Sequence, residues 1–342
     1  MTLPASQEAA VVAASYGVLV RLFPAAKPAL DAQYAASLAQ IPEGDSKTNG
    51  IAVGEFVAEE MVSLRSADGS APISYTLPPA GLGIWRPTSP GAPAVPQWGG
   101  MTPFVLESAT QFNVAGPPEL TTADYAADVN EVKFYGGTTS LLRTPDQTEI
   151  ARFWAESTAI SFNRIARAMA AERQTGLAEN ARLFALMNMA LSDAYVVVFE
   201  TKYRFNFWRP IHAIRENDGT TRYDDGNPDT VPDPTWTPLL ATPAHPEYLS
   251  GHSGTASAAA EVLTDFFGQH AGFSTTSTTL PGVVRSLSSF RDAVSEVADA
   301  RVFGGIHFRR TCLLSNVVGK KIGKFAMKNY LRPLGDDRSE SQ

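Results

Sequence analysis

The sequence predicts an all-α protein, built as two packed helical bundles with a long, proline-rich irregular strap. Three observations favour this class. Apolar residues recur at helical spacing over several long stretches, no stretch shows the alternation of a half-buried strand, and no internal repeat is present. The chain has 342 residues, of which 44% are hydrophobic, enough to bury a large core. We therefore expect one compact unit over residues 1–342, with a frayed tail at 333–342.

The N-terminal part, residues 1–143, is expected to hold helices followed by the strap. Residues 4–40 are alanine-rich with Leu and Val at helical spacing, and a break near 23–28 divides them into two helices. A further helix is expected at 50–66. The apolar start carries Glu8 and no Lys or Arg, the wrong charge for a signal peptide. The localisation stays unknown, and would be secreted or periplasmic if a signal peptide had been removed.

The strap is expected at 67–125, where prolines are too dense for regular hydrogen-bond ladders. Aromatic residues are spaced along it, and they favour a strap ordered across the helices over a disordered linker. These residues are Trp85, Trp98, Phe104 and Phe112.

The C-terminal part, residues 144–332, is expected to be the bundle that carries the functional site. Residues 144–170 open with a capping box from Thr144 to Gln147, with Pro145 at the first helical position. Segments with many Asp, Gly, Pro or Thr residues are expected to be loops. The further helices are expected at 177–203, 252–267, 286–302 and 308–330, and the loops at 216–246 and 271–282.

Charge and composition exclude several kinds of protein. The net charge is −7, which argues against nucleic-acid binding and against attachment to a membrane through a basic surface. The apolar run 183–199 contains Asp193, so we expect a buried helix rather than membrane insertion, with Asp193 in a structural role. The single cysteine, Cys312, lies in an apolar helical segment and is expected to be buried and inert.

Three segments carry unusual polar residues within apolar, helical surroundings. They are 202–215, 245–254 and 300–310, and they hold four of the five histidines and a dense group of cations. A helix that begins at Ser250-Gly251 offers free backbone N–H groups and a positive dipole end to an anion. Taken alone, that feature is explained better by ordinary N-capping, because many helices begin with Ser-Gly.

The cations strengthen the case for an oxyanion site. Lys202 and Arg209 lie among aromatic residues, and Arg301 falls on the apolar face of its helix, seven residues after Val294. Guanidinium forks match tetrahedral oxyanions, although pairing with a carboxylate such as Glu216 would also account for them. The chain has no zinc-ligand spacing, glycine-rich nucleotide loop or Ser/His/Asp elbow.

The spacing Lys-x6-Arg-Pro, then Ser-Gly-His, then Arg-x5-His resembles the vanadium-dependent haloperoxidases and the wider type 2 phosphatidic acid phosphatase superfamily. The strap and the stretch RTPDQTEIARFW look like the bacterial, chloroperoxidase-type branch. The resemblance implies that His307 is the axial ligand of the vanadium, or the nucleophile toward phosphate, and that His252 is the acid–base. It also implies a catalytic role for Lys202 and an oxyanion-binding set made of Lys202, Arg209, Ser250, the Gly251 amide, Arg301 and His307.

The resemblance also implies a halide pocket lined by His245 and Trp208. Members proficient with chloride tend to carry phenylalanine at the position of His245, and bromide-restricted members tend to carry histidine. The chain departs from the family pattern in the second motif at Leu249, where the family has proline. In the third motif it departs at Ala300, where the family has serine, and at Thr311, where an aspartate normally orients the histidine. We therefore expect His307 to lack a carboxylate partner.

The function that the resemblance implies is vanadate-dependent oxidation of bromide or iodide by hydrogen peroxide to a hypohalous equivalent. The cofactor would be vanadate, vanadium(V), with no haem, flavin or nicotinamide. The partners would be hydrogen peroxide, a halide and a small organic acceptor, and a homo-oligomer stays open. Two alternatives remain: a soluble acid phosphatase acting through a phosphohistidine in the same cage, and an inactive oxyanion-binding relic.

Overall fold

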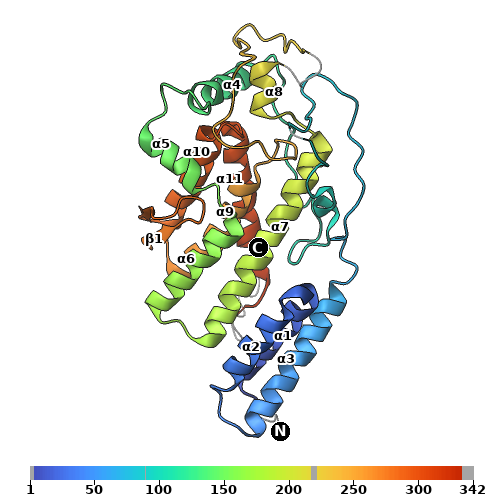
Figure 1. Cartoon of the computed structure of the whole chain (residues 1–342), viewed down its shortest axis with the longest axis vertical. Coiled ribbons are helices and arrows are strands. Elements are labelled where there is room, and N and C mark those ends of the chain that lie inside the picture. Colours follow the sequence, from blue (N-terminus) through green and yellow to red (C-terminus); the bar gives the residue numbers. More distant parts are fainter. Residues whose placement is uncertain (1–3, 89, 217–221, 333–342) are drawn as a thin grey trace, which may run out of the picture. The chain divides into compact units, whose positions relative to one another are not determined.

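The computed structural model describes residues 4–88, 90–216 and 222–332 (Figure 1). The chain divides into two compact units. The first comprises residues up to 68 together with 175–181, and the second comprises the rest. A single unit divided near residue 143 was expected, and the division differs because the strap packs with the C-terminal helices. The expected tail at 333–342 lies outside the described residues.

The first unit consists of α1 (Gln7–Leu22), a 3-10 turn η1 (Pro24–Ala26), α2 (Lys27–Leu38) and α3 (Asp45–Leu64). The expected break near 23–28 is confirmed. Helices α1 and α3 pack through small residues, so their backbones approach closely. A Cβ on Gly54 would lie 2.4 Å from the carbonyl oxygen of Ala10, which only glycine avoids.

The strap of the second unit is anchored by Asp193 in the middle of α7 (Leu177–Phe205). Its carboxylate accepts from the backbone N–H groups of Phe104 at 2.6 Å and of Val105 and Leu106 at 2.8 Å each. A buried carboxylate is stabilised by such donors. Asp193 therefore holds an irregular segment on the longest helix. This agrees with the structural role expected for Asp193 from the sequence.

The mostly helical class is confirmed, with corrections to individual elements. The expected helix at 144–170 is two helices, because residues 154–157 interrupt it, and the expected loop at 271–282 contributes to an antiparallel hairpin. Two helices, α4 and α8, were not expected. The elements are η2 (Pro96–Gly100), α4 (Ala123–Tyr135), α5 (Pro145–Phe153), α6 (Thr158–Arg173), α8 (Pro210–Arg215), α9 (Gly251–Phe267), β1 (Phe273–Thr276), β2 (Val284–Leu287), α10 (Phe290–Phe303) and α11 (Arg309–Asn329).

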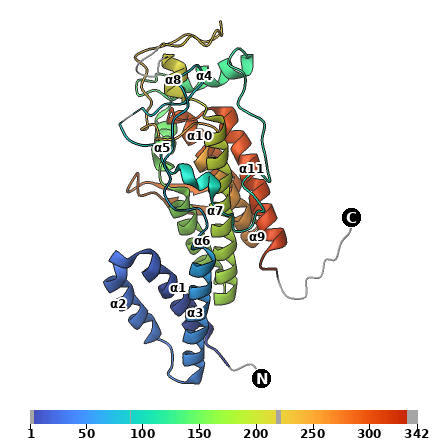
Figure 2. The same ribbon diagram turned by 90° about the vertical axis from the view of Figure 1, so that its right-hand side faces the viewer.

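Helices α9 and α11 lie side by side in the second unit (Figures 1 and 2). A Cβ on Gly319 would lie 2.0 Å from the carbonyl oxygen of Gly254, so the two backbones touch there. This contact holds the start of α9 beside the middle of α11, and the backbone N–H of Ser250 donates to Ser315 Oγ in the same region. The segment before α9 therefore lies beside the start of α11, where Glu247 contacts His307 and Thr311.

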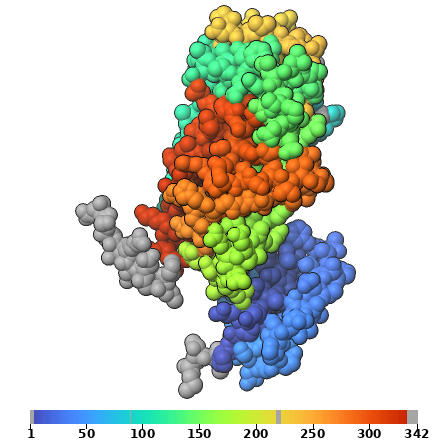
Figure 3. All heavy atoms as spheres, turned by 90° about the vertical axis from the view of Figure 1, so that its left-hand side faces the viewer, coloured from blue at the N-terminus to red at the C-terminus, as the bar shows by residue number. Residues whose placement is uncertain are grey.

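The hairpin and α10 form a surface that adjoins α5 (Figure 3).

By length and composition, α7 could cross a membrane, and α1 together with α2 passes the same test as a bent pair. In the tested part of α7, 61% of the residues are buried by the protein itself, which is typical of a core helix.

Candidate oxyanion-binding site

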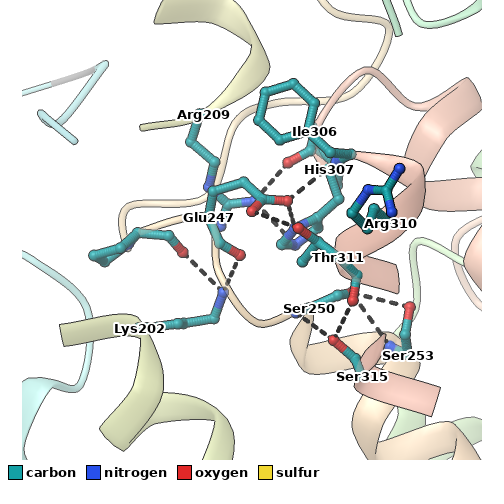
Figure 4. A network of polar contacts seen from close by, with 12 residues as sticks. Lys202, Arg209, Glu247, Ser250, Ser253, Ile306, His307, Arg310, Thr311 and Ser315 are labelled. Carbon is teal, nitrogen blue, oxygen red and sulfur yellow. Dashed lines mark hydrogen bonds and ion pairs between the residues drawn. The ribbon is translucent and has the colours of Figure 1, made fainter. Parts of the chain in front are cut away.

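The residues predicted to bind an oxyanion meet in the second unit. Lys202 lies in the last turn of α7, Arg209 directly before α8, Ser250 directly before α9, Arg301 in the last turn of α10 and His307 just before α11. All five side chains are buried. Figure 4 shows Lys202, Arg209 and His307 around Glu247, with Ser250 beside Ser315. We call Lys202, Arg209, Ser250, Arg301 and His307, together with Gly251, the cage.

The cage cations bind main-chain carbonyls. Lys202 Nζ donates to the carbonyl oxygens of Pro246 at 2.8 Å and Glu247 at 2.9 Å. Arg209 donates from Nη1 to the carbonyl of Ile306 at 2.6 Å. Arg301 Nη2 donates to the carbonyl of Trp154 at 2.5 Å. Among the described residues, no carboxylate lies within ion-pair distance of these three cations, so the alternative of an Arg–carboxylate pair is not observed.

Burial and mutual repulsion make these charges costly. Burial, followed by the charge of Arg209, holds the pKa of Lys202 well below its usual range. Burial lowers the pKa of Arg209 and of Arg301 to about 10 in each case. The charge of Glu247 raises the pKa of Lys202 and of Arg209, but it offsets only part of the effect of burial. An anion placed among them would relieve this cost.

Two further features fit a tetrahedral oxyanion such as vanadate. The Nε atom of Arg301 is buried and has no hydrogen-bond partner in the described part of the chain. Gly251 is buried at the N-terminus of α9, yet a Cβ added there would meet no atom within 4 Å. An unpaired cationic donor and free space at a helix N-terminus are what an oxyanion requires.

His307 is held between a donor and an acceptor. Arg209 Nη1 lies 3.0 Å from His307 Nε2, and a guanidinium can only donate. His307 Nδ1 therefore carries the ring proton, and it lies 2.8 Å from the Glu247 carboxylate. Burial, Arg209 and Lys202 hold the pKa of His307 well below its usual range. The neutral ring thus has its free electron pair on Nε2, where it could bind a metal.

The carboxylate at His307 corrects an expectation from the sequence. We expected no acidic partner, because Thr311 replaces the family's aspartate. Instead Glu247 supplies it, and Thr311 Oγ1 donates to the same carboxylate at 3.0 Å. Glu247 was missed because it lies sixty residues away from His307, in another motif. The available signal was an acidic residue three positions before Ser250 in a chain that lacks the usual aspartate.

His252 lies in the first turn of α9 and has lost most of its basicity. Its Nε2 donates to the carbonyl oxygen of Glu156 at 3.1 Å, so the other ring nitrogen is unprotonated. Burial and the charge of Arg301 lower its pKa to about 3. The Glu156 carboxylate does not counter this, because it pairs with Arg164 at 2.6 Å. A neutral His252 can accept a proton, and an anion bound beside Arg301 would raise its pKa.

The two residues predicted to line a halide pocket lie in different surroundings. His245 Nδ1 accepts from Arg209 Nη2 at 2.9 Å, and its ring packs edge-on against Phe199 with 5.2 Å between centroids. Burial and the charges of Lys202 and Arg209 hold the pKa of His245 well below its usual range, so the ring is neutral. Trp208 is buried, and its indole nitrogen has no hydrogen-bond partner in the described part of the chain. The described contacts do not join Trp208 to His245.

The remaining family departures lie in the packed core. Leu249 and Ala300 are fully buried. Ser250 caps α9 by accepting from the backbone N–H of Ser253 at 3.4 Å, and its own N–H donates to Ser315 Oγ at 2.9 Å. Ser250 is thus both a cap and a member of the cage, so the two interpretations of this residue do not exclude each other.

Comparison with known proteins agrees with these motifs. Residues 182–336 match the family model described as the second helical-bundle domain of VCPO. The vanadium chloroperoxidase of Curvularia inaequalis is 29% identical over 226 residues, which cover 54% of this chain. The match spans only 36% of the length of that protein.

Solved structures agree as well. The crystal structure of the first bacterial vanadium-dependent iodoperoxidase superposes with a TM-score of 0.79 at 27% identity, covering 96% of this chain and 80% of that one. A holo-type bacterial vanadium-dependent chloroperoxidase shares the fold, with a TM-score of 0.71 at 17% identity over 94% of this chain and 81% of that one. The resemblance to vanadium-dependent haloperoxidases and the helical-bundle fold are therefore confirmed.

Proposed function

We propose that this chain is a vanadate-dependent haloperoxidase that oxidises bromide and iodide with hydrogen peroxide. The observation that carries the proposal is the cage itself. Three buried cations with no carboxylate at ion-pair distance among the described residues surround an unprotonated imidazole nitrogen, His307 Nε2, which accepts a hydrogen bond from Arg209 and could bind a metal in its place. The similarity to a bacterial iodoperoxidase favours the softer halides over chloride.

Each residue of the cage has a distinct task in this proposal. Lys202, Arg209 and Arg301 bind the oxyanion oxygens, and the Gly251 amide and Ser250 hydroxyl add donors at the positive end of α9. His307 holds the vanadium through Nε2. Vanadate, when bound, supplies a Lewis-acidic centre that activates peroxide toward halide without changing its oxidation state. No haem, flavin or nicotinamide is then required.

His252 acts on peroxide in this scheme, and Lys202 acts on the bound oxyanion. His252 is neutral, so it can take a proton from incoming hydrogen peroxide, and the bound anion stabilises the imidazolium that forms. The Lys202 amino group is held in place by two carbonyl oxygens, and in its charged form it would stabilise negative charge on a bound oxyanion. A halide, hydrogen peroxide and one proton would together give a hypohalous acid and water, and the hypohalous acid would react with a small organic acceptor.

A second candidate, an acid phosphatase, has one specific observation in its favour. The neutral His307, with an unprotonated Nε2 that faces Arg209 and a carboxylate at Nδ1, also suits a nucleophile toward phosphorus. The same cage would stabilise the trigonal-bipyramidal transition state, and His252 would protonate the leaving alkoxide.

One preparation tests both candidates. Adding orthovanadate should raise the melting temperature, create peroxide-dependent oxidation of bromide and iodide, and suppress any hydrolysis of an aryl phosphate. If vanadate binds and no halide is oxidised, the haloperoxidase proposal is wrong. If vanadate neither binds nor alters either activity, both candidates fail, and an oxyanion-binding relic would be the remaining interpretation.

A further inference from the structure

The side chain of Glu247 is tied to the chain segment that contains His307. Its Oε1 accepts from the backbone N–H of Phe308 at 3.0 Å and lies 2.8 Å from His307 Nδ1. Its Oε2 accepts from Thr311 Oγ1 at 3.0 Å. Both carboxylate oxygens are thus bound to the start of α11, and the residue is fully buried (Figure 4).

We propose that Glu247 is the positioning residue of the site: it holds His307 in its Nδ1–H form and aims Nε2 at the bound oxyanion. It does so from the loop before α9, replacing the aspartate that the family resemblance leads one to expect at position 311. The inference rests on the proposed function only for the identity of the oxyanion.

The contacts of Thr311 support this exchange of roles. Thr311 lies one helical turn after His307 and does not contact the ring in the described structure; its hydroxyl donates to Glu247 instead. Threonine cannot add negative charge, but it can hold a carboxylate that reaches in from another segment. The pair of Glu247 and Thr311 therefore does what a single aspartate at position 311 would do.

The backbone of Glu247 has a separate task. Its carbonyl oxygen accepts from Lys202 Nζ at 2.9 Å, and a change of side chain leaves that contact in place. Substitution at position 247 should therefore release His307 while leaving the cations in position. This separation makes a positioning role distinguishable from a merely structural one.

Two oxyanions make that distinction measurable. Vanadate would bond to Nε2 of His307, so its affinity depends on where the ring points. Phosphate would be held in the ground state by the cations and the α9 amides alone. Losing the second partner of a metal-bound histidine typically costs about 10–100-fold in metal affinity. General damage to the cage would weaken both anions alike.

The experiment compares three variants with the wild-type protein. Glu247→Ala removes the carboxylate, and Glu247→Ala/Thr311→Asp returns one at the start of α11. The matched control is Asp128→Ala, because Asp128 also accepts from a backbone N–H in the first turn of α11, that of Arg310 at 3.1 Å, without contacting His307 in the described structure. Calorimetry measures vanadate and phosphate affinities, and 15N-resolved NMR of the five histidines measures which ring nitrogen of His307 is protonated.

Glu247→Ala should lower the ratio of vanadate to phosphate affinity about 10–100-fold and release the fixed Nδ1–H form. The double variant should recover most of the ratio, and Asp128→Ala should leave it unchanged. An unchanged ratio in Glu247→Ala, or equal losses for both anions, would overturn the inference. Should Glu247→Ala not fold, the double variant decides: a ratio near that of the wild type supports the inference, and a low ratio or failure to fold overturns it.

Failure here and failure of the proposed function are distinguishable. The affinities and the protonated nitrogen are measured without halide or peroxide. A wild-type protein that binds vanadate with the expected ratio and oxidises no halide would contradict the haloperoxidase proposal alone. A halide-oxidising wild type whose ratio does not respond to Glu247→Ala would contradict the positioning role alone.

Discussion

Two arginines of the second unit, Arg285 and Arg301, lie in opposite electrostatic settings. Arg285 in β2 pairs with three carboxylates, those of Glu149 and Glu296 at 2.7 Å each and that of Asp146 at 3.0 Å. Arg301 binds a main-chain carbonyl and keeps a buried Nε without a partner in the described chain. Hydrogen bonds to carboxylates raise the pKa of Arg285, whereas burial lowers that of Arg301.

Trp154 connects the two settings, because its indole N–H donates to Glu296 at 2.9 Å while its carbonyl accepts from Arg301. The difference between the arginines lies in their partners. Carboxylates neutralise Arg285, which can then serve the fold alone. The charge of Arg301 is left for a ligand. A buried cation whose acceptors are only carbonyls is thus a better marker of a binding site than a buried ion pair is.

The largest contrast should come from His307→Ala. This change removes the ring proposed to bond the anion, so it should abolish both halide oxidation and any phosphate-ester hydrolysis. Arg285→Met is the matched change outside the cage and should retain both activities. Steady-state assays at saturating vanadate check this, and measurable turnover in His307→Ala would exclude His307 from the central role.

His252→Ala should have the next largest effect. Vanadate should remain bound, because the cations and His307 are intact, but turnover should fall by roughly 10²–10⁴-fold, the usual contribution of a positioned acid–base. The measurement is kcat at matched vanadate loading, with the loading determined by metal analysis. A variant with the full rate would remove His252 from the acid–base role.

Arg301→Met and Arg285→Met test the comparison directly. Losing a charged donor costs about 1.5–3 kcal/mol, so Arg301→Met should weaken vanadate binding roughly 10–100-fold. Without vanadate its melting temperature should not fall, because a buried charge without a counter-ion is removed. Arg285→Met should do the reverse, with a lower melting temperature and unchanged affinity. If both variants lowered the melting temperature equally, the proposed difference between Arg301 and Arg285 would be wrong.

A smaller effect is expected from His245→Phe. The ring of His245 is neutral and occupies a donor of Arg209, so phenylalanine would free that donor and make the wall beside Phe199 apolar. The chloride-to-bromide ratio of kcat/KM should rise about 2–10-fold, the contribution of one polar contact. A halide series on both proteins measures it. An unchanged ratio would leave His245 as a support for Arg209 alone.

The smallest effect concerns acid stability. The pKa of His252 is about 3, so between about pH 6.5 and 3 the unfolded chain binds a proton that the native state lacks, and the free energy of unfolding falls as the pH falls. Burial raises the pKa of Glu247 to about 7, which gives the opposite slope between about pH 7 and 4.5. The lowered pKa values of His245 and His307 act in the same direction as that of His252, so Glu247 offsets only part of the decline. His252→Gln should flatten the decline in melting temperature on acidification, and a steeper decline would contradict the assignment.

The sequence predicted the cage but not its supports. Lys202, Arg209, Ser250, Arg301 and His307 could be found because their order and spacing lie within short motifs. The carbonyl acceptors at Trp154 and Glu156 carry no side-chain signal, and Glu247 reaches His307 only through the tertiary fold. No local pattern could place these partners.

The same distinction holds for the fold. The long helices were predicted because their apolar periodicity extends over many residues. The hairpin was missed because each strand has only four residues, with Ser and Thr in most of the first. Helix α4 follows the proline-rich zone, and its Thr122 cap and buried Tyr125, Val129 and Val132 at three- and four-residue spacing were a signal that the prolines obscured.

The four-residue interruption between α5 and α6 has a genetic consequence. Carbonyl groups just beyond a helix end lack intrahelical partners, and those of Trp154 and Glu156 are bound by Arg301 and His252. If α5 continued into α6, these oxygens would bond within the helix and both side chains would lose their anchors. Substitutions at the neutral residues of 154–157 that favour helix propagation should therefore inactivate the protein. They would do so although they alter no charged or catalytic group.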